Sequence, residues 1–163
     1  MRGPTVVRQY LKNPKANKES WDEDGYFHTG DIMYCDSASR KWYIVDRRKE
    51  LIKVRGFQVA PPELEAVLLE EKDQIIDCAV VGVRFRADSD VESPRAYVVR
   101  RPGTSVSEDE VKKLISERLA GYKQLTGGVV FVDEIPKSPS GKILKRVLRE
   151  RAQTEMERNR AKL

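Results

Sequence analysis

The chain has 163 residues, of which 39% are hydrophobic and 35% are charged, with a net charge of +5. This length suits about one domain, and no apolar run approaches the roughly 20 residues of a transmembrane helix. One histidine and two cysteines exclude a disulfide scaffold and argue against a His/Cys zinc site, so we expect no metal site.

The charge is distributed unevenly along the chain. Residues 137–163 hold nine Lys or Arg against three Asp or Glu. Such a basic segment suits nucleic acid or an acidic membrane, and equally the solvated face of a helix. Aromatic residues make up 7% of the chain and do not interleave with the basic ones, so a stacking surface for single-stranded nucleic acid is not indicated.

The first part of the chain predicts turns and a hairpin. Residues 1–30 are rich in Asn, Pro, Asp and Gly, which predicts irregular structure with one short helix near Asn13–Glu19. Two strand-like segments, Ile32–Tyr34 and Lys41–Val45, flank a polar turn and predict a β-hairpin. A dense run of charges follows at residues 46–50.

The rest of the chain alternates strands and helices. The short apolar runs Leu51–Val54 and Phe57–Val59 flank Gly56, which indicates a tight turn or a close approach of a ligand. Ser107 and Glu110 form a capping box. Apolar patterns then predict a helix from Pro61, a central strand at Ile75–Val83, a strand at Arg95–Arg101, a helix after Ser107, a strand at Val129–Val132 and a helix from Ile143. This order predicts an α+β fold, a small sheet with a β-hairpin packed by about three helices.

Three segments carry side chains suited to nucleotide chemistry. In GYFHTGD, residues 25–31, a carboxylate after a glycine can accept two ribose hydroxyls, although an ordinary turn is the alternative. In DRRKELIKVRGFQV, residues 46–59, the cations create a positive field suited to phosphates, and the alternative is a charged hairpin edge. In PKSPSGK, residues 136–142, a lysine ends a proline-flanked loop and can place its charge on a phosphate, or remain solvated.

These segments, in this order, resemble the acyl-adenylate-forming enzyme superfamily, which includes acyl- and aryl-CoA ligases, 4-coumarate-CoA ligases and beetle luciferases. The stretch GPTVVRQYLKNPKANKESWDEDGYFHTGD resembles the end of the large N-terminal domain. DRRKELIKVRGFQVAPPELE resembles the hinge and the start of the small C-terminal domain, and PKSPSGKILKR resembles the final lysine motif. The details are most similar to the coumarate-ligase and luciferase branch.

The resemblance implies a domain division. Residues 1–45 would be the end of the large N-terminal AMP-binding domain, and residues 46–50 would be the hinge. Residues 51–150 would form the C-terminal α+β domain, and residues 151–163 would form a polar helical tail. The family's phosphate loop, adenine-stacking motif, magnesium ligand and acyl pocket lie upstream of these segments. We therefore expect the chain alone to be inactive, and its sequence does not specify the carboxylic acid substrate.

The resemblance also implies a two-step reaction that uses ATP with magnesium and then coenzyme A. A carboxylate attacks the α-phosphate of ATP to give an acyl-AMP and pyrophosphate, and the thiol of coenzyme A then displaces AMP. In the first step, the resemblance implies that Lys142 serves adenylation and that Asp31 and Arg47 bind the ribose. In the second step, it implies that Lys53 and Gln58 act on the nucleotide side, and that Lys49, Arg55 and Gly56 contact the nucleotide or coenzyme A. Asp46 would be the hinge between the two steps.

The last three residues, Ala161, Lys162 and Leu163, resemble the SKL-type peroxisomal address. We therefore expect an import receptor as a partner and a peroxisomal location, with a cytoplasmic location as the alternative. A chance tail would carry no such signal.

Other functions stay open at this point. The chain can belong to a luciferase-like monooxygenase, which shares the adenylation step, or to an adenylation domain that loads a carrier protein. The Ala-Lys-Leu terminus argues against carrier loading. A non-catalytic basic module would use residues 137–163 on nucleic acid, whereas the ligase interpretation involves neither nucleic acid nor a transmembrane segment.

Overall fold

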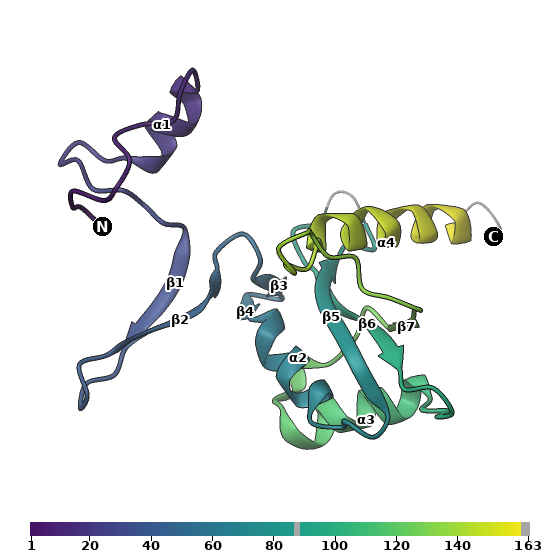
Figure 1. Cartoon of the computed structure of the whole chain (residues 1–163). Helices are drawn as coiled ribbons and strands as arrows, with labels where there is room; N and C mark the ends of the chain where they lie inside the picture. The colour runs from purple at the N-terminus through teal and green to yellow at the C-terminus, as the bar shows by residue number, and fades with distance from the viewer. Residues whose placement is uncertain (87–88, 161–163) are drawn as a thin grey trace. The chain divides into compact units, whose positions relative to one another are not determined.

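The computed structural model describes residues 1–86 and 89–160, and it divides into two compact units, Met1–Lys49 and Glu50–Leu163. The boundary falls within residues 46–50, the segment predicted as a hinge. No helix within the described ranges is long and apolar enough to cross a membrane. We describe each unit by itself (Figure 1).

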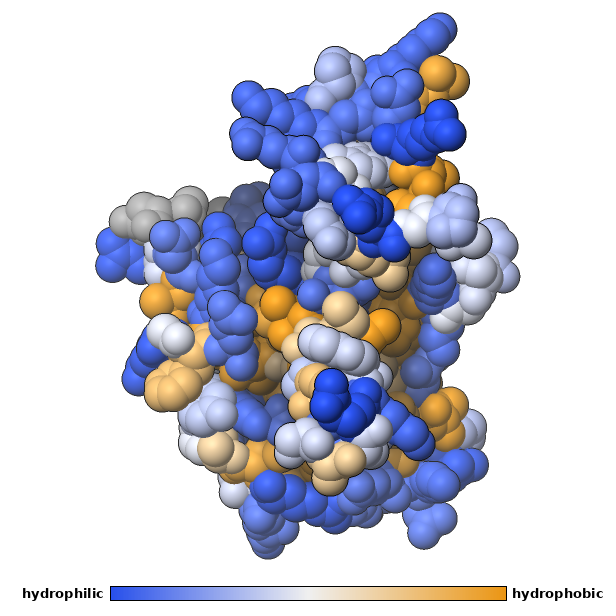
Figure 2. Space-filling view, turned by 90° about the vertical axis from the view of Figure 1, so that its left-hand side faces the viewer, coloured by the Kyte–Doolittle hydropathy of each residue, from blue (hydrophilic) through white to orange (hydrophobic). Residues whose placement is uncertain are grey.

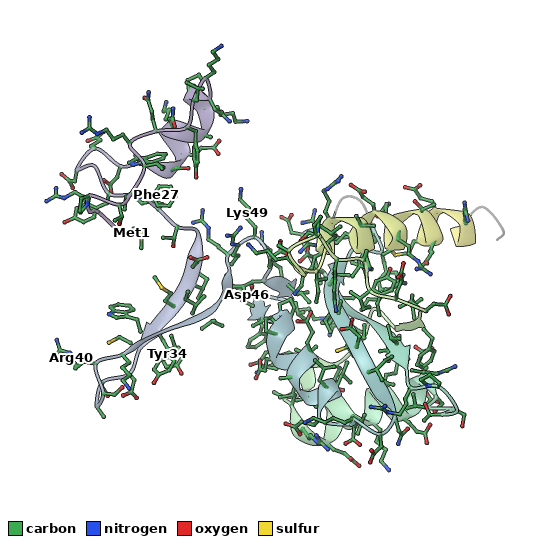
Figure 3. The ribbon with its side chains drawn as sticks, in the orientation of Figure 1. Met1, Phe27, Tyr34, Arg40, Asp46 and Lys49 are labelled. Carbon is green, nitrogen blue, oxygen red and sulfur yellow. The ribbon has the colours of Figure 1, made fainter. Side chains whose placement is uncertain are left out.

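The N-terminal unit contains a short helix and a hairpin. Helix α1 (Pro14–Ser20) is capped by the Asn13 side chain, which accepts a hydrogen bond from the Ala16 amide. Strands β1 (Asp31–Cys35) and β2 (Trp42–Arg47) pair antiparallel and confirm the predicted hairpin. Figure 3 shows Tyr34 and Arg40 toward its turn. Both strands leave large apolar side chains exposed, namely Met33, Tyr34, Trp42, Tyr43, Ile44 and Val45.

Residues before the hairpin are held by one aromatic cluster and the chain's first residue. Trp21 lies between Tyr10 and Phe27, with ring centroids 5.3 and 4.8 Å away. The Phe27 amide donates to the Met1 carbonyl at 2.7 Å, and Figure 3 shows these two residues close together. Helix α1 itself buries no residue. Few contacts therefore hold residues 1–30, which agrees with the irregular structure that their Asn, Pro, Asp and Gly content predicts.

The C-terminal unit contains a hairpin and a three-stranded sheet. Strands β3 (Ile52–Val54) and β4 (Phe57–Val59) pair antiparallel. In the larger sheet, β5 (Ile75–Val83) pairs antiparallel with β6 (Ser93–Arg100), which pairs parallel with β7 (Val129–Phe131). The helices are α2 (Pro61–Leu69), α3 (Glu108–Arg118), the 3-10 turn η1 (Gly121–Lys123) and α4 (Lys145–Arg160).

The sheet separates two apolar clusters, one on each face. Because side chains alternate along a strand, Cys78 and Val80 of β5 pack with one cluster, while Ala79 and Val81 pack with the other. The first cluster contains residues of α2, α3 and the β3–β4 hairpin, and the second contains Leu148 and Ala152 of α4. The α+β prediction, a small sheet and hairpin packed by three helices, is confirmed (Figure 1).

Two sequence predictions about element placement are wrong. The order β5-β6-β7 makes β6 the central strand and β5 an edge strand. The long apolar run in β5 reflects burial on both faces, which does not distinguish an edge from a centre. The last helix begins at Lys145 instead of Ile143, because Ile143 forms a β-bridge with Lys137.

Local signals for the other elements are confirmed. The Ser107 hydroxyl accepts from the Glu110 amide, and the Glu110 carboxylate accepts from the Ser107 amide, which completes the predicted capping box. Both cysteines are free. Burial raises the pKa of the Cys78 thiol to about 12, so this thiol stays protonated at neutral pH.

The charged composition is visible on the surface. Hydrophilic side chains, blue in Figure 2, cover much of the face shown there, and orange apolar side chains reach the surface between them.

Replacing Gly127 by alanine is predicted to destabilise the fold for a packing reason. A Cβ atom there would lie 2.8 Å from both the Pro94 and Ser93 carbonyl oxygens, while a Cβ atom on Gly121 would meet nothing within 4 Å. Overpacking against backbone costs about 1–3 kcal/mol. We expect Gly127→Ala to lower the free energy of unfolding in urea by this amount. Gly121→Ala, the control, should change it by less than about 0.5 kcal/mol, and equal effects would contradict the packing argument.

Candidate functional site

Asp31 and Arg47, 16 positions apart in sequence, lie opposite each other in the β1–β2 ladder. The Arg47 Nε atom is 3.7 Å from the Asp31 Oδ1 atom, and the Arg47 side chain is 73% exposed. The Arg48 amide donates to the Gly30 carbonyl at 2.8 Å and closes this end of the hairpin. Exposed ion pairs contribute little to stability, so both groups remain able to bind a polar ligand.

Asp46, the predicted hinge residue, lies in β2, close to the end of the N-terminal unit, and is marked in Figure 3. Its Oδ1 atom accepts from the Arg47 amide at 2.7 Å. Its Oδ2 atom is buried and has no hydrogen-bond partner among the described residues. A buried acceptor without a donor is unfavourable, so this carboxylate would gain from a donor supplied in another conformation. Lys49, the last residue of this unit, is exposed.

Four predicted residues come together on the β3–β4 hairpin. Lys53 and Gln58 lie directly opposite each other and are exposed. Arg55 and Gly56 form the turn with φ values of 47° and 89°. Two successive left-handed residues are typical of a type I′ turn, which glycine adopts without strain and arginine does not. The turn therefore presents the Gly56 backbone openly, with no atom within 4 Å of a Cβ placed there.

Two contacts that sequence analysis missed hold this hairpin in place. The Lys53 amide donates to the Glu92 carboxylate at 3.1 Å, and the Glu92 amide donates to the Lys53 carbonyl at 2.7 Å. The Phe57 ring stacks on Tyr122 with centroids 4.3 Å apart. No local pattern could identify Glu92, because it lies 39 positions from Lys53.

Lys142 ends a hydrogen-bonded turn within the proline-flanked loop that the sequence predicts. The Ser138 amide donates to the Lys142 carbonyl and the Gly141 amide to the Ser138 carbonyl, both at 2.8 Å. The Leu144 amide donates to the Pro136 carbonyl at 2.8 Å. The Lys142 side chain is exposed and pairs with no acid in the described part of the chain. The backbone therefore fixes the base of an available cation.

Most basic residues of α4 are paired with acids. Lys145 pairs with Glu65, Arg146 with Glu150, Arg149 with Glu50, and Arg151 with Glu155. The positive charge that the helix offers to a polyanion is therefore smaller than the sequence count indicates. This pairing disfavours the basic-module interpretation of residues 137–163.

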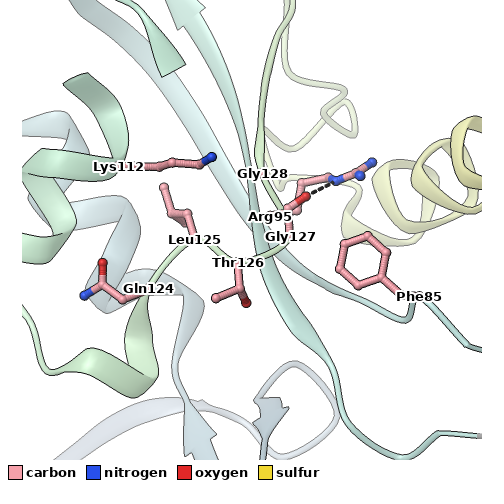
Figure 4. A pocket seen from close by; sticks show the side chains of 8 residues that line it. All are labelled: Phe85, Arg95, Lys112, Gln124, Leu125, Thr126, Gly127 and Gly128. Carbon is pink, nitrogen blue, oxygen red and sulfur yellow. Dashed lines mark hydrogen bonds between the residues drawn. The ribbon is translucent and has the colours of Figure 1, made fainter. Parts of the chain in front are cut away.

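A cavity of about 460 Å³ lies elsewhere in the C-terminal unit (Figure 4). Phe85, Arg95, Lys112 and Leu125 are among its lining residues. Its two cations are already paired, because Arg95 contacts Glu155 and Lys112 contacts Glu108. None of the predicted site residues lines it. Within the described ranges there is also no cluster of three or more His, Cys, Asp or Glu able to hold a metal ion.

Comparison with known proteins defines the class. Residues 63–142 match the family described as the AMP-binding enzyme C-terminal domain. The chain superimposes on the crystal structure of ATP-bound MatB from Rhodopseudomonas palustris with a TM-score of 0.81, at 34% identity over 92% of this chain and 29% of that one. The chain is thus similar, over just under half of its length, to the AMP-binding enzyme C-terminal domain family.

Curated relatives make the class more specific. An acyl-CoA synthetase of Alternaria alternata is 70% identical over 98% of this chain and 28% of its own length. A phenylacetyl-CoA ligase of Aspergillus niger is 56% identical over 93% of this chain and 28% of its own length. The relatives are thus acyl- and aryl-CoA ligases, and the chain spans less than a third of the length of each.

Proposed function

We propose that this chain acts as the C-terminal part of an ATP-dependent acyl- or aryl-CoA ligase. The observation that carries the proposal is the exposed, unpaired Lys142 on a fixed turn of a domain of this family. Its relatives, at 70% and 56% identity, are named as an acyl-CoA synthetase and a CoA ligase. The chain alone should be inactive, since relatives contain a further two thirds or more that it does not span.

In the first step, a carboxylate oxygen attacks the α-phosphorus of ATP, the bond to the β-phosphate breaks, and pyrophosphate leaves. Negative charge grows on the α-phosphate and on the pyrophosphate. An ammonium group placed there stabilises the transition state electrostatically, and we assign this role to Lys142. Asp31 would accept the ribose hydroxyls, with Arg47 beside it.

In the second step, the sulfur of coenzyme A attacks the acyl carbon and AMP leaves. We assign this step to the β3–β4 hairpin, where Lys53 and Gln58 would approach the nucleotide. Arg55 and Gly56 would contact coenzyme A, and Lys49 would assist. Rotation about Asp46 would bring each segment in turn to the substrate, a conformational step of the kind that often limits turnover.

ATP would enter with magnesium. The described residues offer no cluster that fits the ion. We therefore derive no step of this chain through it, and we expect its ligands in the part of the relatives that the chain does not span.

A graft tests the proposal. Residues 1–163 would replace the corresponding part of the A. niger phenylacetyl-CoA ligase, which is 56% identical to them. The graft is expected to form phenylacetyl-CoA from phenylacetate, ATP and coenzyme A. The host without its C-terminal part and the chain alone, which serve as controls, should not. A folded graft no more active than the truncated host would overturn the proposal.

We also propose that Ala161, Lys162 and Leu163, which lie outside the described residues, form a peroxisomal address read by an import receptor. A fluorescent protein ending in residues 150–163 is expected to colocalise with a peroxisomal marker. Deleting Leu163 should disperse it. A diffuse cytoplasmic signal from the intact tail would exclude the address.

A further inference from the structure

A nearly buried ion pair lies just beyond the Lys142 turn. The Lys145 Nζ atom is 3.1 Å from the Glu65 Oε1 atom, and the two side chains are 14% and 13% exposed. The same Glu65 oxygen accepts the Val80 amide proton at 2.8 Å. A single oxygen atom of Glu65, in α2, therefore contacts both Lys145, the first residue of α4, and the backbone of the edge strand β5.

The position of Lys145 is not explained by the residues that the first turn of a helix prefers. A cation in the first turn opposes the helix dipole, whose positive end lies there. Helix α4 begins with Lys145 and Arg146 and has no acidic residue in its first turn. The Glu65 carboxylate supplies the missing negative charge from another helix. Desolvating such a pair often offsets its attraction, so stability alone is a weak reason for it.

The pair also has a counterpart at the other end of the turn. The Lys137 Nζ atom is 2.6 Å from Asp77 Oδ2 on the same strand, β5. The Lys142 turn is thus tied to β5 at both ends, by Lys137 before it and by Lys145 after it. The Lys137 pair is more exposed, at 42% and 28%, so the Lys145 pair is the tighter of the two restraints.

We propose that Glu65 and Lys145 are positioning residues for Lys142. Their ion pair fixes the first turn of α4 against β5 and so sets where Lys142, three residues earlier, projects. The inference rests on the proposed role of Lys142 in adenylation. Neither residue needs to touch the substrate, and their loss should slow the first half-reaction without slowing the second.

The first test uses the full 163-residue chain. The Leu144 amide donates to the Pro136 carbonyl, and the Lys142 amide donates to the Ser138 Oγ atom at 3.2 Å. In Lys145→Gln, hydrogen exchange at these two amides is expected to rise about tenfold or more, because their bonds would open locally. Lys145→Arg keeps the ion pair and should restore protection. Arg146→Gln is the matched control, since the Arg146 side chain is 81% exposed and pairs with Glu150 of its own helix. Amides of β6 should be unchanged throughout.

The second test uses the graft. Lys145→Gln and Glu65→Gln should each slow acyl-AMP formation about tenfold or more, as expected for a displaced catalytic group. Thioester formation from supplied acyl-AMP should stay within about twofold of the parent. Glu65→Gln keeps an acceptor for Val80, so it decides the matter if Lys145→Gln fails to fold.

Each outcome has one meaning. Unchanged exchange in the turn of the folded variants would overturn the proposal. The proposal would also be overturned if Lys145→Gln and Glu65→Gln raise the exchange in the turn but form acyl-AMP at the normal rate, while Lys142→Ala forms it slowly. If Lys142→Ala itself leaves adenylation unchanged, the proposed function of Lys142 fails, and raised exchange would still support the pair as the restraint that fixes the turn.

Discussion

Replacing Lys142 by alanine in the graft is expected to slow acyl-AMP formation about a hundredfold or more. This is the loss seen when one preorganised electrostatic stabiliser of a transition state is removed. Lys142 suits this role because its amine is exposed and unpaired, while hydrogen bonds of the 138–144 turn fix its backbone. The stabilisation is needed only while pyrophosphate departs, so formation of the thioester from supplied acyl-AMP should be nearly unaffected.

The measurement is single-turnover release of pyrophosphate, compared with coenzyme A-dependent consumption of acyl-AMP. Arg146→Ala is the matched control, because the Arg146 side chain is 81% exposed and pairs with Glu150 of its own helix. The control variant should lose much less of its rate of acyl-AMP formation than Lys142→Ala does. If Lys142→Ala slows both half-reactions equally, its assignment to adenylation alone is wrong.

Gly56→Val is expected to slow the second half-reaction about a hundredfold while leaving adenylation intact. The position has φ = 89°, which a β-branched residue adopts only with strain. Relief of that strain would distort the turn between Lys53 and Gln58, and a displacement of about 1 Å can cost this much. The valine would also fill the open space through which the coenzyme A chain would approach.

The control for this prediction is Gly103→Val. Gly103 also has a positive φ, of 83°, and open space around its Cα atom, but it lies on the turn between β6 and α3. Both variants carry similar backbone strain, and only Gly56→Val should affect thioester formation. Equal loss in the two variants would mean that strain, and not the position of Gly56, limits the reaction.

Local signals predicted most of the elements. The Ser107 capping box, the Pro61 helix start and the hairpins depend on neighbours within a few residues, so a single sequence contains the information. The edge position of β5 and the start of α4 at Lys145 depend on which strands and bridges form, and were predicted wrongly.

The candidate site divides in the same way. Lys142 and Gly56 stand out by their turns and charges, and the resemblance to a known superfamily assigned them roles. The residues that hold these segments in place did not stand out in the sequence. Glu92 holds Lys53, and Glu65 holds Lys145, through side chains that the fold brings together from distant segments. An ordinary surface glutamate and one that anchors a functional loop look alike in sequence.

In the function proposed above, one domain serves two reactions through two separate segments. The most direct test measures both half-reactions side by side in Lys142→Ala and Gly56→Val grafts. A crossed pattern is expected, in which Lys142→Ala loses adenylation and keeps thioester formation, and Gly56→Val does the reverse. Two variants that lose both half-reactions in the same proportion would contradict it.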